Sequence, residues 1–166
     1  MSNRDVVVRR AVGEDWARLK AIRLEALADS PAAYGSTLES AQEFSNKRWR
    51  AMAEQFVYYL AEHNGRVVGM ASGGGNDEHP GTKWLYGMYV TPSARGGGAA
   101  YLLVDAVATW ARAEGATELY LHVTSSLARA KAFYEKAGFE PNGERHPMDR
   151  DPSLELITMV GTIVDA

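Results

Sequence analysis

Three consecutive glycines stand before an amphipathic segment in the middle of the chain, within TPSARGGGAAYLLVDAV at residues 91–107. Glycine is a poor residue near the start of a helix unless something must approach the backbone closely. The segment that follows, 95–113, carries Leu103, Val107 and Trp110 on one helical stripe. The segment before it, 83–90, has the composition of a strand. We therefore expect the chain to pass from a strand to a helix through a turn built of small residues.

Strand and helix patterns alternate along the rest of the sequence. Strands are expected at 6–8, 83–90, 118–123 and 154–164, with a hairpin over 56–72 that turns at Asn64-Gly65. Helices are expected at 14–28, 45–52, 95–113 and 126–137, and 73–82 has the composition of a flexible loop. Gly87 inside a strand pattern indicates a bulge or a close backbone approach. This alternation predicts an α/β or α+β domain with a mixed sheet.

Composition narrows the class of protein. The 166 residues suffice for a single domain, 1–166, that buries about 70% of its unfolded surface. The net charge of −3 gives no electrostatic footprint for nucleic acid, and no basic run suggests a membrane surface. The absence of cysteine excludes disulfides, thiolate metal sites and a cysteine nucleophile. The four histidines show no metal spacing, and no apolar run is long enough for a signal peptide or a membrane helix. We expect a cytoplasmic protein without a bound metal.

The glycine turn has the features of an anion-binding site. The first N–H groups of a helix have no partner within it and lie at the positive end of the helix dipole, so they can hold phosphate. The alternative is that Gly96 to Gly98 only form a tight turn, and the glycines alone do not decide between the two. A P-loop requires GxxxxGK[ST] and a dinucleotide-binding loop requires GxGxxG, and the residues after Gly96 supply neither pattern.

A third pattern fits these residues. The spacing Val90-x-Pro92-x-x-Arg95-Gly96-x-Gly98-x-Ala100-x-x-Leu103 resembles the coenzyme-A motif of the GCN5-related N-acetyltransferases, the GNAT family. Residues 119–139, LYLHVTSSLARAKAFYEKAGF, resemble the second signature of that family: a strand, a polar turn, a helix with a tyrosine and a closing Gly-Phe. The two motifs lie in the right order and together cover about residues 84–140. The resemblance implies a GNAT-like fold, with a mixed central sheet of six to seven strands flanked by about four helices.

The resemblance also implies that the cofactor is acetyl-CoA and indicates which residues would bind it. The pyrophosphate would lie on N–H groups of the glycine turn, which comprises Gly96, Gly97, Gly98, Ala99, Ala100 and Tyr101. The pantetheine arm would pair like an added strand with the backbone of Met88, Tyr89 and Val90. The second signature would contribute Ser126, Leu127, Ala130, Phe133 and Tyr134. Arg95 either adds charge to the phosphates or is a solvated surface arginine.

Tyr134 is the candidate for the chemical step. In the family, the matching tyrosine protonates the departing thiolate of coenzyme A. A phenol with a pKa near 10 is still protonated at pH 7, and a thiolate with a conjugate pKa near 8.5 can accept its proton. The alternative is ordinary packing, because Ala130, Phe133 and Ala137 share its helix face.

His122 is the candidate base. Family members that acetylate ribosomal-protein N-termini carry a glutamate in a strand that reads L-E-V, and this chain reads Leu121-His122-Val123 at the matching offset from Tyr134. An imidazole could accept a proton from the amine directly or through water. The alternative is a hydrogen-bonded histidine in a buried strand. Glu62, Glu78 and His79 are further candidates.

One position departs from the family pattern. The second signature usually has an asparagine about seven residues before the tyrosine, and Leu127 stands there. The missing amide contact should weaken cofactor binding by about 1 kcal/mol, unless Ser125 or Ser126 replaces it.

The resemblance thus implies an N-acetyltransferase that moves acetyl from acetyl-CoA to a primary amine of a small molecule, peptide or protein by direct attack. A non-catalytic acyl-CoA-binding module of the same fold is the alternative, and a structural domain with a degenerate loop is the third. The resemblance implies that the first helix, residues 30–45 and the 73–82 loop line the acceptor groove. Their residues encode no recognisable substrate, and they include Tyr34, Ser36, Glu39 and Glu78. An acidic groove would favour cationic amines. A homodimer is plausible from the family.

Overall fold

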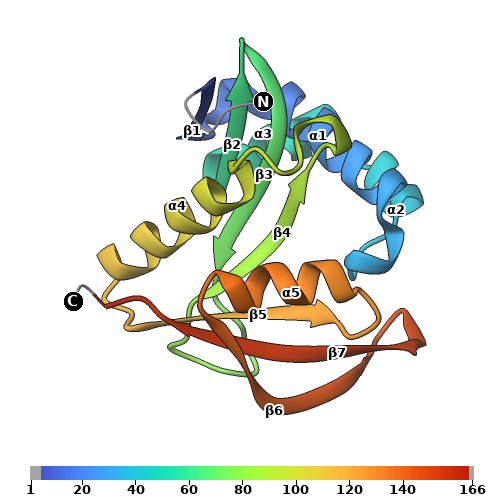
Figure 1. Ribbon diagram of the computed structural model, residues 1–166. Helices are drawn as coiled ribbons and strands as arrows, with labels where there is room; N and C mark the ends of the chain where they lie inside the picture. The colour runs from blue at the N-terminus through green and yellow to red at the C-terminus, as the bar shows by residue number, and fades with distance from the viewer. Residues whose placement is uncertain (1–4, 165–166) are drawn as a thin grey trace.

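The computed structural model describes residues 5–164 and contains one seven-stranded sheet with helices on both faces (Figure 1). The strands are β1 (Val6–Arg10), β2 (Val57–His63), β3 (Arg66–Gly74), β4 (Trp84–Val90), β5 (Glu118–Thr124), β6 (Phe139–Met148) and β7 (Asp151–Thr162). The helices are α1 (Trp16–Asp29), α2 (Leu38–Gln42), α3 (Asn46–Gln55), α4 (Ala99–Ala113) and α5 (Ala128–Lys136). Short 3-10 turns occupy Gly13–Asp15, Pro31–Ala33 and Pro92–Ala94.

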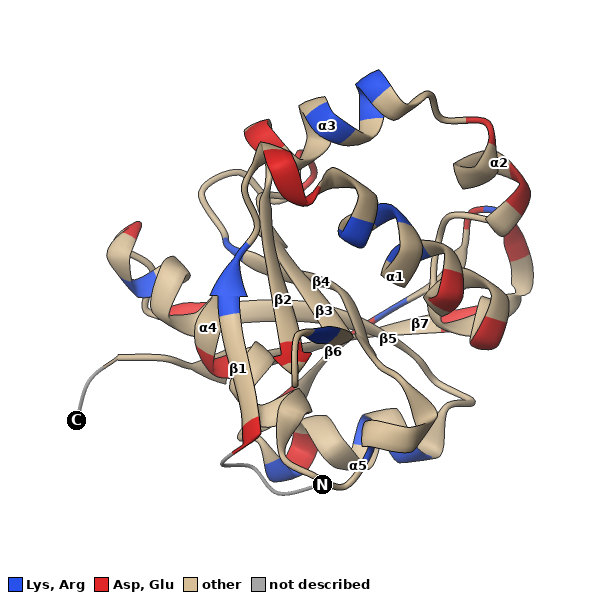
Figure 2. Ribbon diagram, turned by 90° about the horizontal axis from the view of Figure 1, so that it is seen from above, with Lys and Arg blue, Asp and Glu red and all other residues tan. Residues whose placement is uncertain are grey.

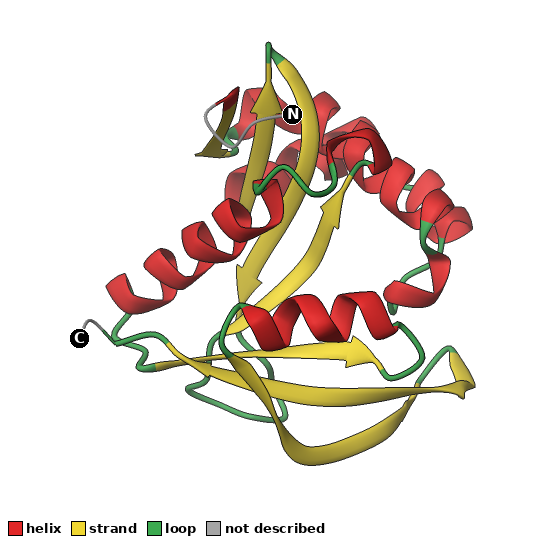
Figure 3. Ribbon diagram, in the orientation of Figure 1, coloured by secondary structure: helices red, strands yellow, loops and turns green. Residues whose placement is uncertain are grey.

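The sheet consists of two parts that meet over a short stretch, in the order β1-β2-β3-β4-β5-β7-β6. Strands β1 to β4 pair antiparallel with one another, and so do β5, β7 and β6. Between the parts, β4 runs parallel to β5, and the paired residues are Trp84 with Tyr120 and Leu85 with Leu121. Beyond these pairs the two strands diverge, as Figures 1 and 3 show. We use the term fork for the region between the part of β4 that follows Leu85 and the part of β5 that follows Leu121.

A bulge in β4 turns this strand away from β5. Met70 of β3 pairs with Tyr89 and Ser72 pairs with Tyr86, so Gly87 and Met88 together face a single residue of β3. Gly87 has a φ of +60°, which glycine adopts without strain. A bulge of this kind bends the strand that carries it. The bulge predicted from Gly87 is confirmed, and it explains where the fork begins.

The helices divide the apolar core into two layers. Helices α4 and α5 pack on one face of the sheet, against residues that include Leu85, Leu121 and Met159. Helices α1 and α3 pack on the other face, against Leu60 and Met70 among others (Figure 3). Among the described residues, no helix is long and apolar enough to span a bilayer.

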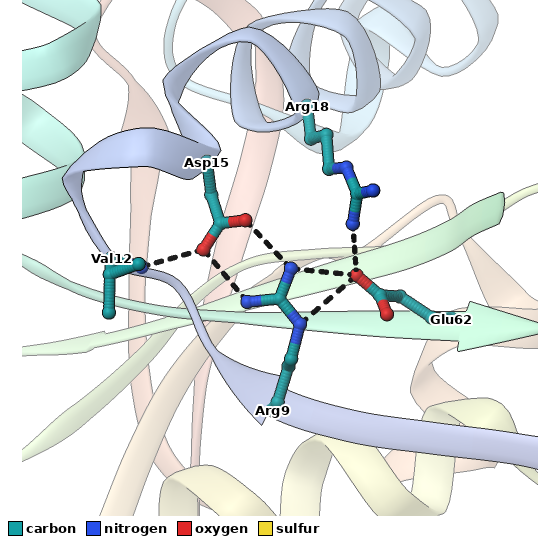
Figure 4. A network of polar contacts seen from close by, with 5 residues as sticks. All are labelled: Arg9, Val12, Asp15, Arg18 and Glu62. Carbon is teal, nitrogen blue, oxygen red and sulfur yellow. Dashed lines mark hydrogen bonds and ion pairs between the residues drawn. The ribbon is translucent and has the colours of Figure 1, made fainter. Parts of the chain in front are cut away.

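A charged network fixes the start of α1 to the edge of the sheet (Figure 4). Arg9 of β1 donates to both carboxylate oxygens of Asp15 at 2.8 and 2.7 Å and to Glu62 of β2 at 2.9 Å. Arg18 of α1 donates to the same Glu62 oxygen at 2.8 Å. The Arg9 guanidinium lowers the pKa of the Asp15 carboxyl to about 2. These half-buried charges are thus matched to each other within the fold.

Most predicted elements are confirmed to within a few residues, and two differences have clear causes. Helix α4 begins at Ala99 instead of Arg95, because Gly96 and Gly98 have φ angles of +82° and +88° that a helix does not accommodate. The sequence pattern does not predict β6, which is exposed along most of its length and contains Pro141 and Pro147. Proline is tolerated there because β6 is an edge strand.

Candidate active site

The glycine turn leaves a set of backbone N–H groups without helical partners at the start of α4. The first hydrogen bond into the helix runs from the N–H of Leu102 to the carbonyl of Gly98, at 3.2 Å. The N–H groups of Ala99, Ala100 and Tyr101 therefore precede the helical ladder. Gly98 is the N-cap and has no side chain to cap them. The turn thus offers a row of donors at the positive end of a 15-residue helix.

The glycines in this turn are required by their backbone conformation. Gly96 and Gly98 both have positive φ, and a Cβ added at Gly96 would meet no atom within 4 Å. Open space beside Gly96 leaves room for a ligand to approach. Gly97 is buried between them.

Arg95 makes two hydrogen-bonding contacts within the chain. Its Nε donates to the carbonyl of Val90 at 3.0 Å, and its Nη2 donates to Asp29 at 2.9 Å. The side chain thereby ties the end of β4 to the end of α1, and it lowers the pKa of the Asp29 carboxyl. About half of the side chain remains exposed.

The backbone of β4 turns two of its three predicted contact residues toward the fork. The N–H of Thr91 bonds to the carbonyl of Val68 in β3, so by the alternation of a strand the backbone of Tyr89 also faces β3. Met88 and Val90 then face the fork, and both carbonyls there accept hydrogen bonds from side chains. Tyr89 instead places its hydroxyl 2.9 Å from Glu25 of α1. Of the three residues, only Met88 and Val90 present backbone groups to the open edge.

Tyr134 lies on the inner face of α5 and packs against the rings of Phe133 and Phe139. The residue is buried, and its hydroxyl makes no hydrogen bond to another described residue. Burial first, and the nearby Tyr34 second, raise the pKa of Tyr134. The phenol is therefore protonated at neutral pH and keeps its proton available for donation.

The remaining residues of the second signature lie along α5 and just before it. Phe133 contacts the ring of Tyr101 of α4, with centroids 4.8 Å apart, so these two rings bridge the helices. Ala130 packs against the core beside them. Leu127 is the N-cap of α5 and provides no side-chain cap, and Ser126 is exposed in the turn before it.

His122 projects from the opposite face of β5. Its ring lies 4.6 Å from the ring of Trp84 and 4.9 Å from that of His146, on the face of β5 that points away from α5. Burial, together with His146 and His79, lowers the pKa of His122 to about 4. The imidazole is therefore neutral at pH 7, and any proton that it accepts must pass on to solvent.

The further candidate bases are engaged elsewhere or exposed. Glu62 belongs to the network with Arg9 and Arg18. His79 stacks on Trp84 and lies 3.8 Å from Glu144, while Glu78 is exposed. Among residues 5–164 no group of three or more potential ligands could hold a metal ion.

Residues 31–34 close the open end of the fork, within the 30–45 segment that the family resemblance assigns to the acceptor groove. The hydroxyl of Tyr34 donates to the carbonyl of Met88 at 2.8 Å. On the other side, Thr124 of β5 donates to Ala32, and Arg150 from the β6–β7 turn donates to Tyr34. The segment thereby links both arms of the fork. The contact between Tyr34 and Met88 does not follow from the sequence, because the two residues are far apart along the chain.

Comparisons with known proteins agree with this architecture. Residues 19–139 match the family model described as "Acetyltransferase (GNAT) family". The chain therefore belongs to the GNAT acetyltransferase family.

Curated relatives and solved structures extend the comparison. An uncharacterized N-acetyltransferase of Mycobacterium tuberculosis H37Rv is 38% identical over 85 residues, and the match covers 51% of this chain and 53% of the relative. The chain thus spans about half the length of the curated relatives that it matches. The structure of yncA from Salmonella typhimurium, solved with its cofactor acetyl-CoA, has a TM-score of 0.77 at 22% identity and covers 97% of this chain and 95% of yncA. A GNAT acetyltransferase from Streptococcus pneumoniae has a TM-score of 0.78 at 18% identity, covering 96% and 99%. These two structures establish the likeness of fold.

Proposed function

We propose that this chain is an N-acetyltransferase that transfers acetyl from acetyl-CoA to a primary amine by direct attack. One arrangement carries the proposal: the glycine turn follows the end of β4, the backbone of Met88 and Val90 faces the fork, and the free hydroxyl of Tyr134 lies on α5 near Tyr34. Each corresponds to one part of the cofactor. Family membership and the acetyl-CoA complex of yncA support the same assignment.

The residues present suit acetyl-CoA. The N–H groups that precede Leu102 can receive a diphosphate. Met88 and Val90 can pair with the amides of an extended arm, because their backbone groups face the fork. When bound, acetyl-CoA supplies a thioester whose acyl group a neutral amine can attack. The hydroxyl of Tyr34 holds the Met88 carbonyl in the present structure, so the arm would share or displace this contact.

We assign the proton transfers to two residues on opposite faces of β5. Tyr134 donates its proton to the sulfur that leaves, from the α5 face. His122, on the opposite face of β5, accepts a proton from the amine through water and releases it to solvent. Its low pKa makes this second contribution the smaller one, because an efficient base has a pKa near the working pH. The chain has no cysteine, so an acyl-cysteine intermediate does not arise.

Replacing Tyr134 by phenylalanine tests the proposal. The ring would still pack, and only the proton donor would be lost, so kcat should fall about 100-fold or more while coenzyme A still stabilises the protein against heat. Thiol release from acetyl-CoA with a panel of amines measures kcat, and the absence of cysteine keeps the background low.

Tyr120→Phe is the matched control, because its hydroxyl contacts Glu118 at the start of β5, and the residue precedes the fork. Unchanged turnover in Tyr134→Phe would refute the acid role. Stabilisation by coenzyme A without turnover of any amine would favour the acyl-CoA-binding module.

A further inference from the structure

Arg23 of α1 is a half-buried cation without a counter-charge among the described residues. Its Nη1 is shielded from solvent and makes no hydrogen bond, and the side chain forms no ion pair with a described residue. The guanidinium carbon lies 4.9 Å from the centroid of the Tyr34 ring. Burial lowers the pKa of Arg23. Burying a charge without a partner is costly, so such groups normally have one.

Other arginines of this protein do have carboxylate partners, and Arg9 is an example. Arg9 is neutralised by Asp15 and Glu62 on neighbouring elements (Figure 4). Arg18, five residues earlier in α1, also has a carboxylate partner. Of these three arginines, Arg23 is the one that no carboxylate of the described residues neutralises. An anion from outside the chain would supply the missing partner.

Arg23 lines a cavity of about 280 Å³ on the α1 face of the sheet. Its walls come from α1, α2, α3 and strands β2 to β4, with these residues: Arg23, Ser36, Ala41, Phe44, Arg48, Trp49, Met52, Tyr58, Met70, Ser72, Tyr86 and Gly87. The lining holds two arginines and several hydroxyls but no carboxylate. Acidic residues lie on the exposed helix α2 outside it, where Figure 2 shows them. The expectation of an acidic acceptor groove therefore does not hold for this cavity.

The cavity adjoins the position at which the fork opens. A Cβ built on Gly87 would lie 3.7 Å from Nη1 of Arg23, so the guanidinium lies against β4 at its bulge. The next residue is Met88, whose carbonyl accepts the Tyr34 hydroxyl. Tyr34 thus contacts both Arg23 and the strand edge assigned to the cofactor.

We propose that the acceptor is a small amine that carries a carboxylate close to its nitrogen, as a free amino acid does, and that Arg23 binds this carboxylate. This inference rests on the proposed acetyltransferase function. A guanidinium matches a carboxylate with two parallel hydrogen bonds. At about 30 Å³ for each water-sized group, the cavity holds on the order of ten such groups, which suits one amino acid and not a folded protein segment. With the carboxylate on Arg23, the amine points toward Met88.

The first arm of the experiment uses the unaltered protein. Each of a set of amino acids is compared with its carboxamide and with the amine that lacks the carboxyl group, by thiol release and mass detection of the product. We expect kcat/KM for the amino acid to exceed that for the other two by at least about 30-fold. Equal or better use of the carboxamides or of peptide amines would overturn the inference.

The second arm uses variants at Arg23. Arg23→Gln should lose the preference for the carboxylate, and Arg23→Lys should retain part of it, because a lysine supplies charge without the bidentate fork. Lys20→Gln removes one charge from the same helix at an exposed site bonded to Asn46, and it should behave as the unaltered protein.

Binding measurements separate this inference from the proposed function. Coenzyme A should stabilise Arg23→Gln as it does the unaltered protein, whereas the additional stabilisation by an amino acid should vanish. If coenzyme A stabilises the protein and other amines are acetylated but no amino acid is, the inference about Arg23 fails and the acetyltransferase proposal survives. If coenzyme A has no effect and no amine is acetylated, both fail.

Discussion

On the α4 side of the fork, the groups available to a ligand are backbone N–H and C=O groups of the glycine turn and of β4. On the α1 side they are side chains drawn from six elements around the Arg23 cavity. Backbone recognition depends on a local conformation, which a short run of residues determines. Side-chain recognition depends on residues brought together from distant parts of the chain. The two sides should therefore respond differently to mutation.

The largest effect is expected at Gly98, where the backbone itself forms the site. An alanine at a φ of +88° is strained by about 1–2 kcal/mol, and relief of this strain would misalign the N–H donors, so we expect coenzyme A affinity to fall at least 100-fold. Gly115 has a φ of +89° at the far end of α4 with open space around it, so Gly115→Ala should cost similar stability and leave affinity intact. Titration calorimetry and thermal unfolding measure both quantities. Equal affinities in the two variants would contradict a backbone site.

An intermediate effect of the opposite sign is expected at Arg23. Arg23→Met keeps the apolar contacts of the side chain and removes a buried charge that no carboxylate matches, so the free energy of unfolding should rise by about 1–2 kcal/mol. Denaturant titration without ligand measures it. Arg9→Met is the comparison, and it should lower stability, because it leaves Asp15 and Glu62 without their partner. A loss of stability in Arg23→Met would mean that the fold already satisfies this charge.

The smallest effect concerns the pH dependence contributed by His122. Its pKa of about 4 in the folded chain lies below the unfolded value near 6.5, so the unfolded chain binds more protons between these pH values. Stability from this group is therefore fully present above about pH 6.5 and is lost as the pH falls to 4. Because the ring is partly exposed and screened by solvent, we expect about 1 kcal/mol. Between pH 7 and pH 4, the free energy of unfolding should fall by about 1 kcal/mol less in His122→Gln than in the unaltered protein. An equal fall in the two proteins would contradict a lowered pKa of His122.

The same contrast explains what could be predicted from the sequence. The glycine turn and the tyrosine of α5 belong to continuous motifs, so their positions follow from local spacing. The bulge at Gly87 and the hairpin at Asn64-Gly65 are likewise local consequences of residues that accept positive φ.

The features that escape sequence analysis all depend on the tertiary fold. The sequence pattern places Arg23 on an amphipathic helix without indicating its neighbours. Only the packed structure shows that it has no carboxylate partner. Tyr34 and Arg150 are far apart in the sequence and meet at the end of the fork. The exposed strand β6 lacks the alternation that marks buried strands, because its side chains have no core to face.

The short contact between β4 and β5 has a consequence for the lifetime of the protein. Two residue pairs join the strands of the two halves, and the segment 31–34 bridges the halves at the open end. We therefore expect the halves to separate more readily than either half unfolds. A ligand that pairs with Met88 and Val90 fills the fork and binds only the closed arrangement, which raises the folded population with ligand concentration. Resistance to proteolysis would then rise and fall with the supply of acetyl-CoA, and the amount of this protein would follow the supply of the acetyl donor in the proposed reaction.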